Sequence, residues 1–325
     1  MGDPLTAPPE LITVGRISVD LYAEQLGVGL DDVQTFRKSV GGTATNVAVA
    51  AARLGHRAAV VTKVGGDPFG AYLRRALDER FGVDTRFVGV DLELPTPLAF
   101  AVMDPPDDPQ IIFRRRPAAP DMQLTLDDVD ATMIAETSIF WVSASTVSGE
   151  PCRSTVRSLL ERRARRAHTV LDLDWRPQFW PSVDDGRREI SALLAHVTLA
   201  IGNRTECEVA VGTSDPEAAA DRLLACGLTG AIVKMGGDGV LVATADGHRE
   251  LVRPYAVEVV CGLGAGDAFG GAFCHGLLTG ADLATCARMG NAAGAIVAGR
   301  LMCADDMPTS AEIEGLMGVA DVADR

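Results

Sequence analysis

The chain has 325 residues, of which 47% are hydrophobic and 5% aromatic, and its formal net charge is -14 at pH 7. This length and composition suit one large domain with a core of small aliphatic side chains. The negative charge argues against nucleic acid as the main partner, because a phosphate backbone requires a basic surface. It does not exclude a nucleotide, which local glycine turns can hold.

Seven cysteines are scattered along the chain and form no CxxC pair. Scattered cysteines in apolar segments are typical of reduced core residues in a cytosolic protein. The N-terminus lacks the basic and apolar regions of a signal peptide, and no apolar run approaches the length of a membrane span. These observations predict a cytoplasmic protein that has no membrane partner.

Short apolar runs alternate with helical patterns over most of the chain. The runs predict strands at 11–15, 58–64, 138–142, 168–172, 199–202 and 231–234. Helices are expected over 47–54 and 69–78. This alternation predicts an α/β fold, with a doubly wound, mostly parallel sheet and helices on both faces.

Two segments, at about 20–40 and 96–116, contain strand-like residues without intervening helices. In the second, apolar runs at 98–103 and 110–114 flank a turn at 104–109 that is rich in proline and aspartate, which predicts a β-hairpin. We expect the two segments to form a small β-sheet lid inserted in one domain over 11–310, with tails at 1–10 and 311–325. The alternative is a plain surface hairpin. A lid sheet has edges to cover, so a homodimer through it is an open possibility.

A glycine-rich turn, Gly262-Leu263-Gly264-Ala265-Gly266-Asp267, stands late in the chain. The β-branched run 257–260 before it predicts a strand, and the small residues after it predict a helix. Unpaired N–H groups at such a helix start bind anions, and the glycines carry no Cβ that would block a phosphate. The turn fits neither the dinucleotide fingerprint nor the P-loop. An ordinary strand-to-helix turn is the alternative.

Asp267 is the one ionisable residue of this turn. A carboxylate is a poor phosphate ligand, but it is a natural proton acceptor for a hydroxyl that attacks a phosphate. We therefore interpret the segment as the anion hole of a phosphotransferase, formed by Gly264, Ala265 and Gly266, with Asp267 as the catalytic base.

A second glycine pair, Gly41-Gly42, precedes Thr43-Ala44-Thr45-Asn46 and an alanine-rich helix pattern. Gly-Gly-x-x-x-Asn near the start and Gly-Ala-Gly-Asp near the end, in this order, resemble the ribokinase-like (PfkB) family of carbohydrate kinases. The likeness covers about residues 11–308. It implies ATP-dependent phosphorylation of a sugar hydroxyl, with Mg2+ and a β-sheet lid.

Three further segments, 15–22, 36–42 and 171–180, resemble the subgroup of 5-dehydro-2-deoxygluconokinases of inositol catabolism. This resemblance implies that the terminal hydroxyl of a sugar acid is the acceptor. A 2-keto-3-deoxygluconate kinase, a fructokinase or another sugar kinase of the family are alternatives. So is a sugar-binding regulator that lost catalysis, although the intact Asp267 argues against it.

For the acceptor sugar, the resemblance implies that Asp20 holds hydroxyl groups. Gly41 and Gly42 allow the backbone to pass close to the substrate, and the Asn46 amide can both donate and accept hydrogen bonds. A helix cap is the alternative role for Asn46.

Arg176 follows the predicted strand 168–172, at the sheet edge where open α/β proteins bind ligands. A guanidinium can clamp a carboxylate with two parallel hydrogen bonds, which a sugar acid requires and a neutral sugar does not. Arg114, Arg115 and Arg116 form a second basic cluster, of which Arg115 is expected to reach the substrate. The alternative for each of these three is a surface charge.

On the nucleotide side, Asn203 and Glu206 match the Asn-x-x-Glu motif of the family, whose glutamate supports Mg2+ through water. Lys234, Gly236, Gly237 and Gly239 resemble the loop beside the nucleotide phosphates and ribose, and Asn291 is expected on the helix that flanks the adenine. No histidine pair has metal-ligand spacing. Many relatives carry Asp-Thr before the late glycines, where this chain has Cys261-Gly262-Leu263, so a monovalent-cation requirement stays open.

Overall fold

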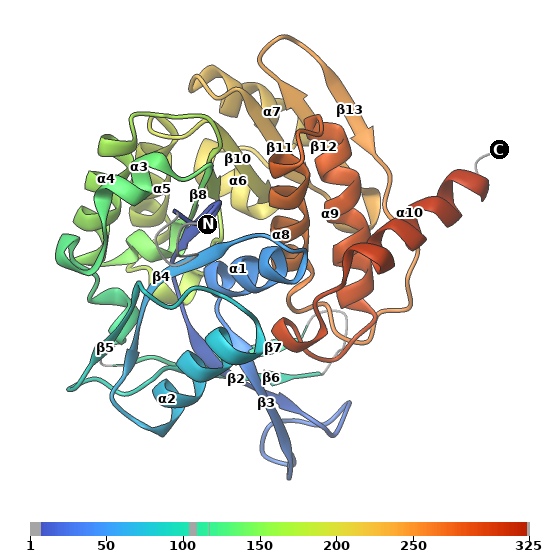
Figure 1. The fold of residues 1–325 in the computed structure, drawn as a ribbon. Helices are drawn as coiled ribbons and strands as arrows, with labels where there is room; N and C mark the ends of the chain where they lie inside the picture. Colours follow the sequence, from blue (N-terminus) through green and yellow to red (C-terminus); the bar gives the residue numbers. More distant parts are fainter. Residues whose placement is uncertain (1–7, 104–108, 117, 324–325) are drawn as a thin grey trace, which may run out of the picture.

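The computed structural model describes residues 8–103, 109–116 and 118–323. Its centre is a nine-stranded sheet in the order β13-β12-β11-β10-β9-β8-β1-β4-β5 (Figure 1). Neighbouring strands from β5 to β11 are parallel, as predicted, and β12 and β13 add an antiparallel edge. In chain order the strands are β1 (Leu11–Val14), β4 (Ala58–Gly65), β5 (Val88–Asp91), β8 (Ile139–Ser143), β9 (Thr169–Asp172), β10 (Leu199–Asn203), β11 (Gly230–Lys234), β12 (Val240–Thr244) and β13 (Arg249–Val252).

Successive strand residues point to opposite faces of this sheet and build two cores. Leu11 and Trp141 belong to one core, and Ile12 and Phe140 to the other. The first core is covered by α1 (Thr43–Arg53), α2 (Pro68–Arg75), α8 (Ala265–Leu278), α9 (Leu283–Ala298) and α10 (Ser310–Ala323). The second is covered by α3 (Ala131–Glu136), α4 (Cys152–Arg163), α5 (Val183–Leu194), α6 (Arg204–Val211) and α7 (Pro216–Ala225).

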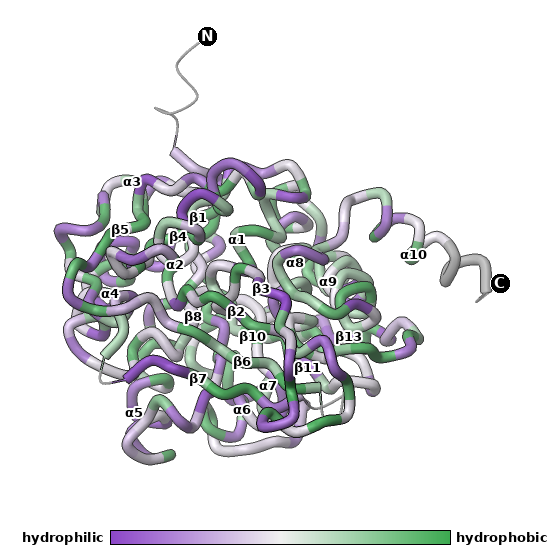
Figure 2. The backbone as a smooth tube through the Cα atoms, turned by 90° about the horizontal axis from the view of Figure 1, so that it is seen from below, coloured by the Kyte–Doolittle hydropathy of each residue, from purple (hydrophilic) through white to green (hydrophobic). Residues whose placement is uncertain are grey.

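Small residues let α1 and α8 approach closely, which matters because both helices carry site residues. A Cβ on Gly271 of α8 would lie 2.2 Å from the Cβ of Ala50 in α1. Figure 2 shows hydrophobic residues gathered along the central strands and α1, with hydrophilic residues along the outer loops. Among the described helices, none is long and apolar enough to cross a lipid bilayer.

A second, four-stranded sheet, in the order β3-β2-β6-β7, lies at the lower edge of the molecule in Figure 1. We call it the lid sheet; it contains β2 (Ser18–Ala23), β3 (Phe36–Gly41), β6 (Leu98–Val102) and β7 (Gln110–Arg114). β6 and β7 pair antiparallel, which confirms the predicted hairpin, and β2 and β6 pair parallel. Residues 104–108 of the predicted hairpin turn lie outside the described residues.

Single helical turns connect several of these elements. They lie at Ala76–Arg80, Pro120–Met122, Leu126–Asp128, Ala144–Ser148, Pro177–Phe179, Gly236–Asp238 and Ala304–Asp306.

Two predictions about the C-terminal third are wrong. Residues 257–260 form no strand: β13 ends at Val252, and the side chains of Val257 and Val259 are 41% and 40% exposed along a cavity instead of pairing in the sheet. The expected tail from 311 is helical, because Ile313 of α10 is buried against the first core. Residues 1–7 of the expected N-terminal tail lie outside the described residues.

Candidate active site

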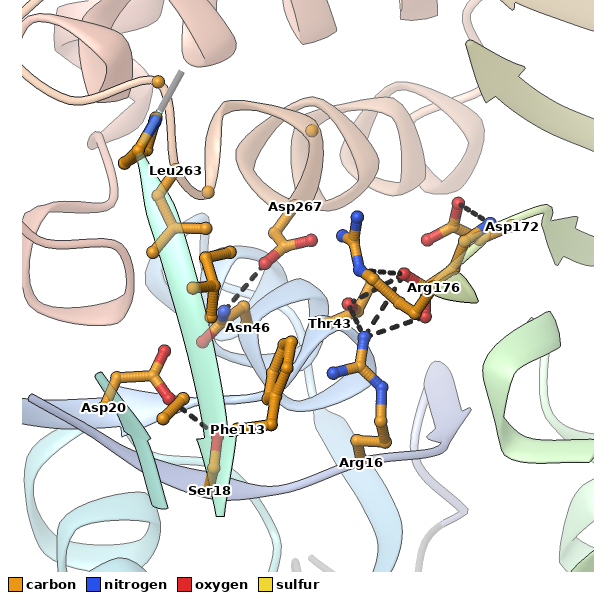
Figure 3. Close-up of a pocket in the computed structure, with 18 of the residues that line it drawn as sticks. Arg16, Ser18, Asp20, Thr43, Asn46, Phe113, Asp172, Arg176, Leu263 and Asp267 are labelled. Atoms are coloured by element: carbon orange, nitrogen blue, oxygen red, sulfur yellow. Dashed lines mark hydrogen bonds and ion pairs between the residues drawn. The ribbon is translucent and has the colours of Figure 1, made fainter. Parts of the chain in front are cut away.

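The carboxyl ends of four parallel strands and the N-terminus of α8 surround one cavity of about 390 Å³. The strand ends contribute Arg16, Asp172, Asp174, Arg176, Asn203 and Lys234, and the lid sheet contributes Ser18, Asp20, Ala99, Ile111 and Phe113. Figure 3 shows Asp267 between Asp20 on one side and Arg176 on the other. The cavity therefore brings together three residues that lie far apart in the sequence.

Helix α8 begins without a side-chain cap. Gly264 occupies the N-cap position with φ 86°, a left-handed conformation that favours glycine, and no side chain bonds to the first N–H groups of the helix. A Cβ on Gly264 would lie 2.3 Å from Cys303 Sγ, so the site excludes larger residues. The N–H groups of Gly264, Ala265, Gly266 and Asp267 are consequently available to an anion.

Asp267 stands in the first turn of α8 and is paired with α1. The Asn46 amide Nδ2 donates to Asp267 Oδ2 at 2.7 Å. Burial raises the pKa of Asp267 to about 6, and the Asn46 hydrogen bond opposes that rise. Asn46 is not a helix cap, because α1 starts at Thr43 with Gly42 as its N-cap.

Asp20 faces the cavity from strand β2 of the lid sheet. Its carboxylate is buried, accepts a hydrogen bond from Ser18 Oγ at 2.6 Å, and has a pKa raised by burial to about 7. A Cβ on Gly41 would lie 2.0 Å from this carboxylate, and Gly42 has φ 101°. A Cβ on Gly42 would lie 2.2 Å from the Arg16 carbonyl oxygen, so Gly41 lets the backbone pass beside Asp20 and Gly42 lets it pass beside Arg16.

Arg176 reaches the cavity from the turn after β9. Its Nε pairs with Asp174 Oδ1 at 3.1 Å, and none of the hydrogen bonds between described residues uses its two Nη nitrogens. Asp174 is also bound by Arg16 at 2.9 Å, and although burial raises its pKa, the two guanidinium groups and a hydrogen bond from Ser145 together lower it. Asp174 therefore fixes Arg176 through one nitrogen and leaves the guanidinium fork facing the cavity.

Arg115 does not reach this cavity, which corrects the sequence interpretation. Its guanidinium is paired with the buried Asp121 and lies over the Phe179 ring, 5.3 Å from the ring centroid. None of the described arginines at 114–116 lines the main cavity. Its partner Asp121 lies six residues further along the chain, in a separate turn. No local sequence pattern indicates that this turn contacts Arg115.

A second cavity of about 930 Å³ adjoins the first. Asn203, Lys234, Gly262 and Gly266 line both cavities. The second cavity is also lined by the predicted nucleotide-side residues Gly236, Gly237, Gly239 and Asn291, by Ala265 of the predicted anion hole, and by Val257 and Val259. The N-terminus of α8 therefore stands at the junction of a polar cavity and a larger one.

Asn203 and Glu206 form a reciprocal cap at the start of α6. The Asn203 N–H donates to Glu206 Oε2 at 2.7 Å, and the Glu206 N–H donates to Asn203 Oδ1 at 2.9 Å. Glu206 is buried and lines the main cavity beside Lys234. Burial opposes the charge of Lys234, but the carboxylates of Glu206, Asp172 and Asp267 together raise its pKa.

These groups fit a hydrated magnesium ion carried by phosphates. No three described His, Cys, Asp or Glu residues converge to hold a metal by themselves. Glu206 and Asp172 nevertheless line the cavity, and carboxylate oxygens are the ligand type that Mg2+ prefers, while Mg2+ usually retains several waters. The uncapped N-terminus of α8 supplies the matching site for phosphate oxygens.

Sequence reasoning missed Arg16, Asp172 and Asp174 as site residues. Arg16 follows β1 and Asp172 ends β9, so the strand-end rule that selected Arg176 applies equally to them. Asp174 has φ 22°, an unusual conformation for a residue other than glycine, and this conformation has no signature in the local sequence.

Comparison with known proteins gives a family match over almost the whole chain. Residues 9–310 match the model described as pfkB family carbohydrate kinase. The 5-dehydro-2-deoxygluconokinase of Photobacterium profundum is 34% identical over 310 residues, covering 93% of this chain and 92% of the relative. The 5-dehydro-2-deoxygluconokinase 2 of Bacillus cereus is 30% identical, covering 97% and 96%.

Solved structures share the fold. A candidate ribokinase II of E. coli in complex with ATP and Mg2+ matches with a TM-score of 0.86 at 25% identity, covering 96% of this chain and 99% of the other. The fructokinase of Vibrio cholerae O395, in its fructose, ADP and calcium ion bound form, has a TM-score of 0.83 at 22% identity, covering 96% and 100%. At 22% identity, the similarity to the fructokinase indicates a shared fold and nothing about function.

Proposed function

Because the chain belongs to the pfkB family of carbohydrate kinases, we propose that it phosphorylates the terminal hydroxyl of a sugar acid, 5-dehydro-2-deoxygluconate. ATP is the phosphoryl donor, and Mg2+ accompanies it. The observation that carries the proposal is the position of Asp267 in the main cavity, opposite Arg176 and next to Gly266, which lines both cavities. The names of the two relatives support the choice of acceptor.

In the proposed reaction the sugar acid occupies the main cavity, and the nucleotide occupies the larger one. Asp267 accepts the proton of the terminal hydroxyl as the hydroxyl oxygen attacks the γ-phosphorus, and the bond between the γ-phosphorus and the bridging oxygen of ATP breaks to release ADP. The N–H groups of Gly264, Ala265 and Gly266 stabilise the charge on the transferring phosphoryl group. A positioned base and such donors each contribute roughly 10²- to 10⁴-fold in rate.

Magnesium would be held by Glu206 and Asp172, largely through water, and it would neutralise charge on the phosphate oxygens. Lys234 lies beside these carboxylates and the α8 N-terminus, where it would add a positive charge near the phosphates. Asn291 lies on α9 in the larger cavity and donates to the Arg253 carbonyl at 2.9 Å, so its side chain would shape the adenine pocket.

The acceptor is recognised at two points. Asp20 receives hydrogen bonds from sugar hydroxyls, which replace the water lost by its buried carboxylate. Asn46 and Gly42 line the cavity next to Asp20, and Gly41 lets the backbone pass against the Asp20 carboxylate. Arg176 binds the substrate carboxylate through its two Nη nitrogens, and this contact distinguishes a sugar acid from a neutral sugar.

A kinase screen tests the assignment. Purified protein is given Mg·ATP with 5-dehydro-2-deoxygluconate, 2-keto-3-deoxygluconate, fructose and ribose, and ADP formation is followed. We expect the highest kcat/KM with 5-dehydro-2-deoxygluconate. A higher kcat/KM with fructose would overturn the sugar-acid assignment and favour a fructokinase, whereas no sugar-dependent ADP formation would favour a sugar-binding regulator.

A place in inositol catabolism, in the cytoplasm where ATP is supplied, follows from this substrate. We also propose a homodimer through the lid sheet, whose edge strands β3 and β7 leave backbone groups open to pairing. Light scattering coupled to size-exclusion chromatography should give twice the chain mass of 34.1 kDa. A mass of one chain would contradict the dimer.

A further inference from the structure

A cysteine lies behind the catalytic base. Cys303, in the turn between α9 and α10, is 0% exposed, and its Sγ lies 3.7 Å from Asp267 Oδ2. The same oxygen accepts a hydrogen bond from the Asn46 amide Nδ2 at 2.7 Å. A thiol carries one proton and an ionised carboxylate carries none, so the thiol is the donor. None of the hydrogen bonds between described residues uses Asp267 Oδ1.

The same thiol supports the anion hole. It fills the space where a side chain at Gly264 would stand, with its Sγ 2.3 Å from the position of that missing Cβ. Cys303 therefore contacts both the uncapped start of α8 and the aspartate in its first turn. A change at this one position alters the two groups together.

The turn that carries Cys303 is fastened to the lid sheet. The Cys303 N–H donates to the Tyr22 hydroxyl of β2 at 3.2 Å. Two residues later, Asp305 accepts a hydrogen bond from Ser39 of β3 and pairs with Arg80. These contacts hold the turn from the lid side while the thiol faces Asp267.

We propose that Cys303 is a positioning residue for phosphoryl transfer: with Asn46 it holds Oδ2 of Asp267, so that Oδ1 faces the acceptor hydroxyl. The proposal rests on the proposed role of Asp267 as the base. Burial raises the pKa of Cys303 well above its ordinary value, so the thiol stays protonated and remains a donor. Donation to a carboxylate favours its ionised form, so loss of the thiol should make Asp267 harder to ionise.

Cys303→Ala removes the donor, and Cys286→Ala is its matched control. Cys286 is also 0% exposed, donates to the Ala281 carbonyl at 3.7 Å, and lies 2.7 Å from the position of a Cβ on Gly276 of α8. It shares the packing of Cys303 but has no hydrogen bond to Asp267. Cys303→Ser keeps a donor of different strength and reach.

The measurement is the pH dependence of kcat together with the KM for ATP and the melting temperature. The charged groups that face Asp267 stay the same in every variant; they are Arg16, Asp20, Asp172, Asp174, Arg176 and Lys234. For Cys303→Ala we expect kcat to fall about threefold to tenfold, the size of one hydrogen bond. The acid limb, which is the acidic side of the profile of kcat against pH, should shift to higher pH by about half a unit. The KM for ATP should stay within about twofold of the wild-type value.

Cys286→Ala should lose comparable thermal stability and leave the acid limb in place. If both alanine variants have the same kcat and acid limb, Cys303 only packs and the proposal is wrong. If Cys303→Ala fails to fold, Cys303→Ser provides the test. A changed hydrogen-bond donor must shift the acid limb, so an acid limb at the wild-type pH would contradict the proposed hydrogen bond. Near-normal turnover of Asp267→Asn would instead show that Asp267 is not the base. Failure of the proposed function can therefore be distinguished from failure of the Cys303 proposal.

Discussion

Two carboxyl groups of the cavity, Asp20 and Asp267, are set apart from surface carboxylates by burial. Their pKa values rise from 3.8 to about 7 and about 6, whereas the pKa of the buried Asp174 is lowered by Arg16, Arg176 and the Ser145 hydrogen bond, which together oppose its burial. At the residue scale, the cavity therefore separates carboxyl groups that can take a proton from one that anchors cations.

Asp267→Asn should lower kcat by about 10²-fold or more, because the amide is nearly isosteric but cannot accept the proton. The Asn46 hydrogen bond can persist to the new amide oxygen, so the fold and ATP binding should be preserved. Steady-state kinetics, ATP titration calorimetry and the melting temperature check this. A variant that binds ATP normally and turns over near the wild-type rate would exclude Asp267 as the base.

Activity should fall on the acid side of about pH 6, because Asp267 must be ionised to work and its pKa is raised to about 6. The slope should approach about tenfold in kcat per pH unit. A raised carboxyl pKa contributes stability that is present below the unfolded pKa of 3.8 and lost as the pH rises through about 6. Titration of this group at pH 5 therefore inactivates without unfolding, and activity should return on readjustment to pH 7.5. Flat kcat between pH 7.5 and 5 would contradict the prediction.

Arg176→Lys keeps a positive charge but loses the planar fork. We expect the KM for the sugar acid to rise at least about tenfold, or about 1.4 kcal/mol, and the KM for ATP to change little. Arg114→Lys, at an exposed position of the lid sheet outside the cavity, is the control and should leave both values unchanged. An unchanged KM for the sugar acid in Arg176→Lys would contradict the proposed binding of the substrate carboxylate by Arg176.

At the scale of elements, the start of α8 depends on a backbone shape that only glycine adopts easily. Gly264→Ala adds left-handed strain and a clash with Cys303, while Gly280→Ala adds a similar strain at φ 80° with nothing within 4 Å. We expect Gly280→Ala to cost about 1 kcal/mol and to keep kcat, and Gly264→Ala to cost more and lower kcat about tenfold or more. Denaturant unfolding and kinetics check both; equal effects would mean that the clash is relieved.

Elements with a strong apolar period were predictable from the sequence. The parallel strands and the hairpin of the lid sheet were predicted from local runs of valine, isoleucine and leucine. Asp267 was predicted from the glycine-rich turn that contains it, and Asp20 from the family resemblance. The strand expected at 257–260 was wrong because its valines line a cavity, a property that depends on α8 and α9 and not on the valines themselves. Helix α10 was missed because its burial rests on few residues, such as Ile313.

Side-chain partners were less predictable than elements. Arg115 and Arg176 look alike in the sequence, yet Asp121 binds the first and Asp174 anchors the second toward the cavity. Arg16 lies 158 residues from its partner Asp174, and Cys303 lies 36 residues from Asp267. Such pairs are decided by tertiary packing, which one sequence without its fold does not specify.

At the scale of the whole molecule, the site is assembled from nearly the full length of the chain. Its groups come from the lid sheet, from the carboxyl ends of β1, β9, β10 and β11, and from helices α1 and α8. The sheet supplies the fixed floor, and the lid sheet supplies the wall that carries Asp20 and Phe113. Closure of this wall over the substrate would exclude water, which limits hydrolysis of ATP without an acceptor.

The wall shared by the two cavities has a thermodynamic consequence. Because both cavities share a wall formed by Asn203, Lys234, Gly262 and Gly266, we expect whichever ligand binds first to order these groups for the other. Linkage requires the resulting gain in affinity to be reciprocal: the factor by which the sugar acid tightens ADP binding must equal the factor by which ADP tightens sugar-acid binding. Calorimetric titrations in both orders should give one common factor of roughly fivefold or more. Affinities that do not depend on the other ligand would mean that the shared wall is already rigid, and that donor and acceptor sites act as separate thermodynamic units.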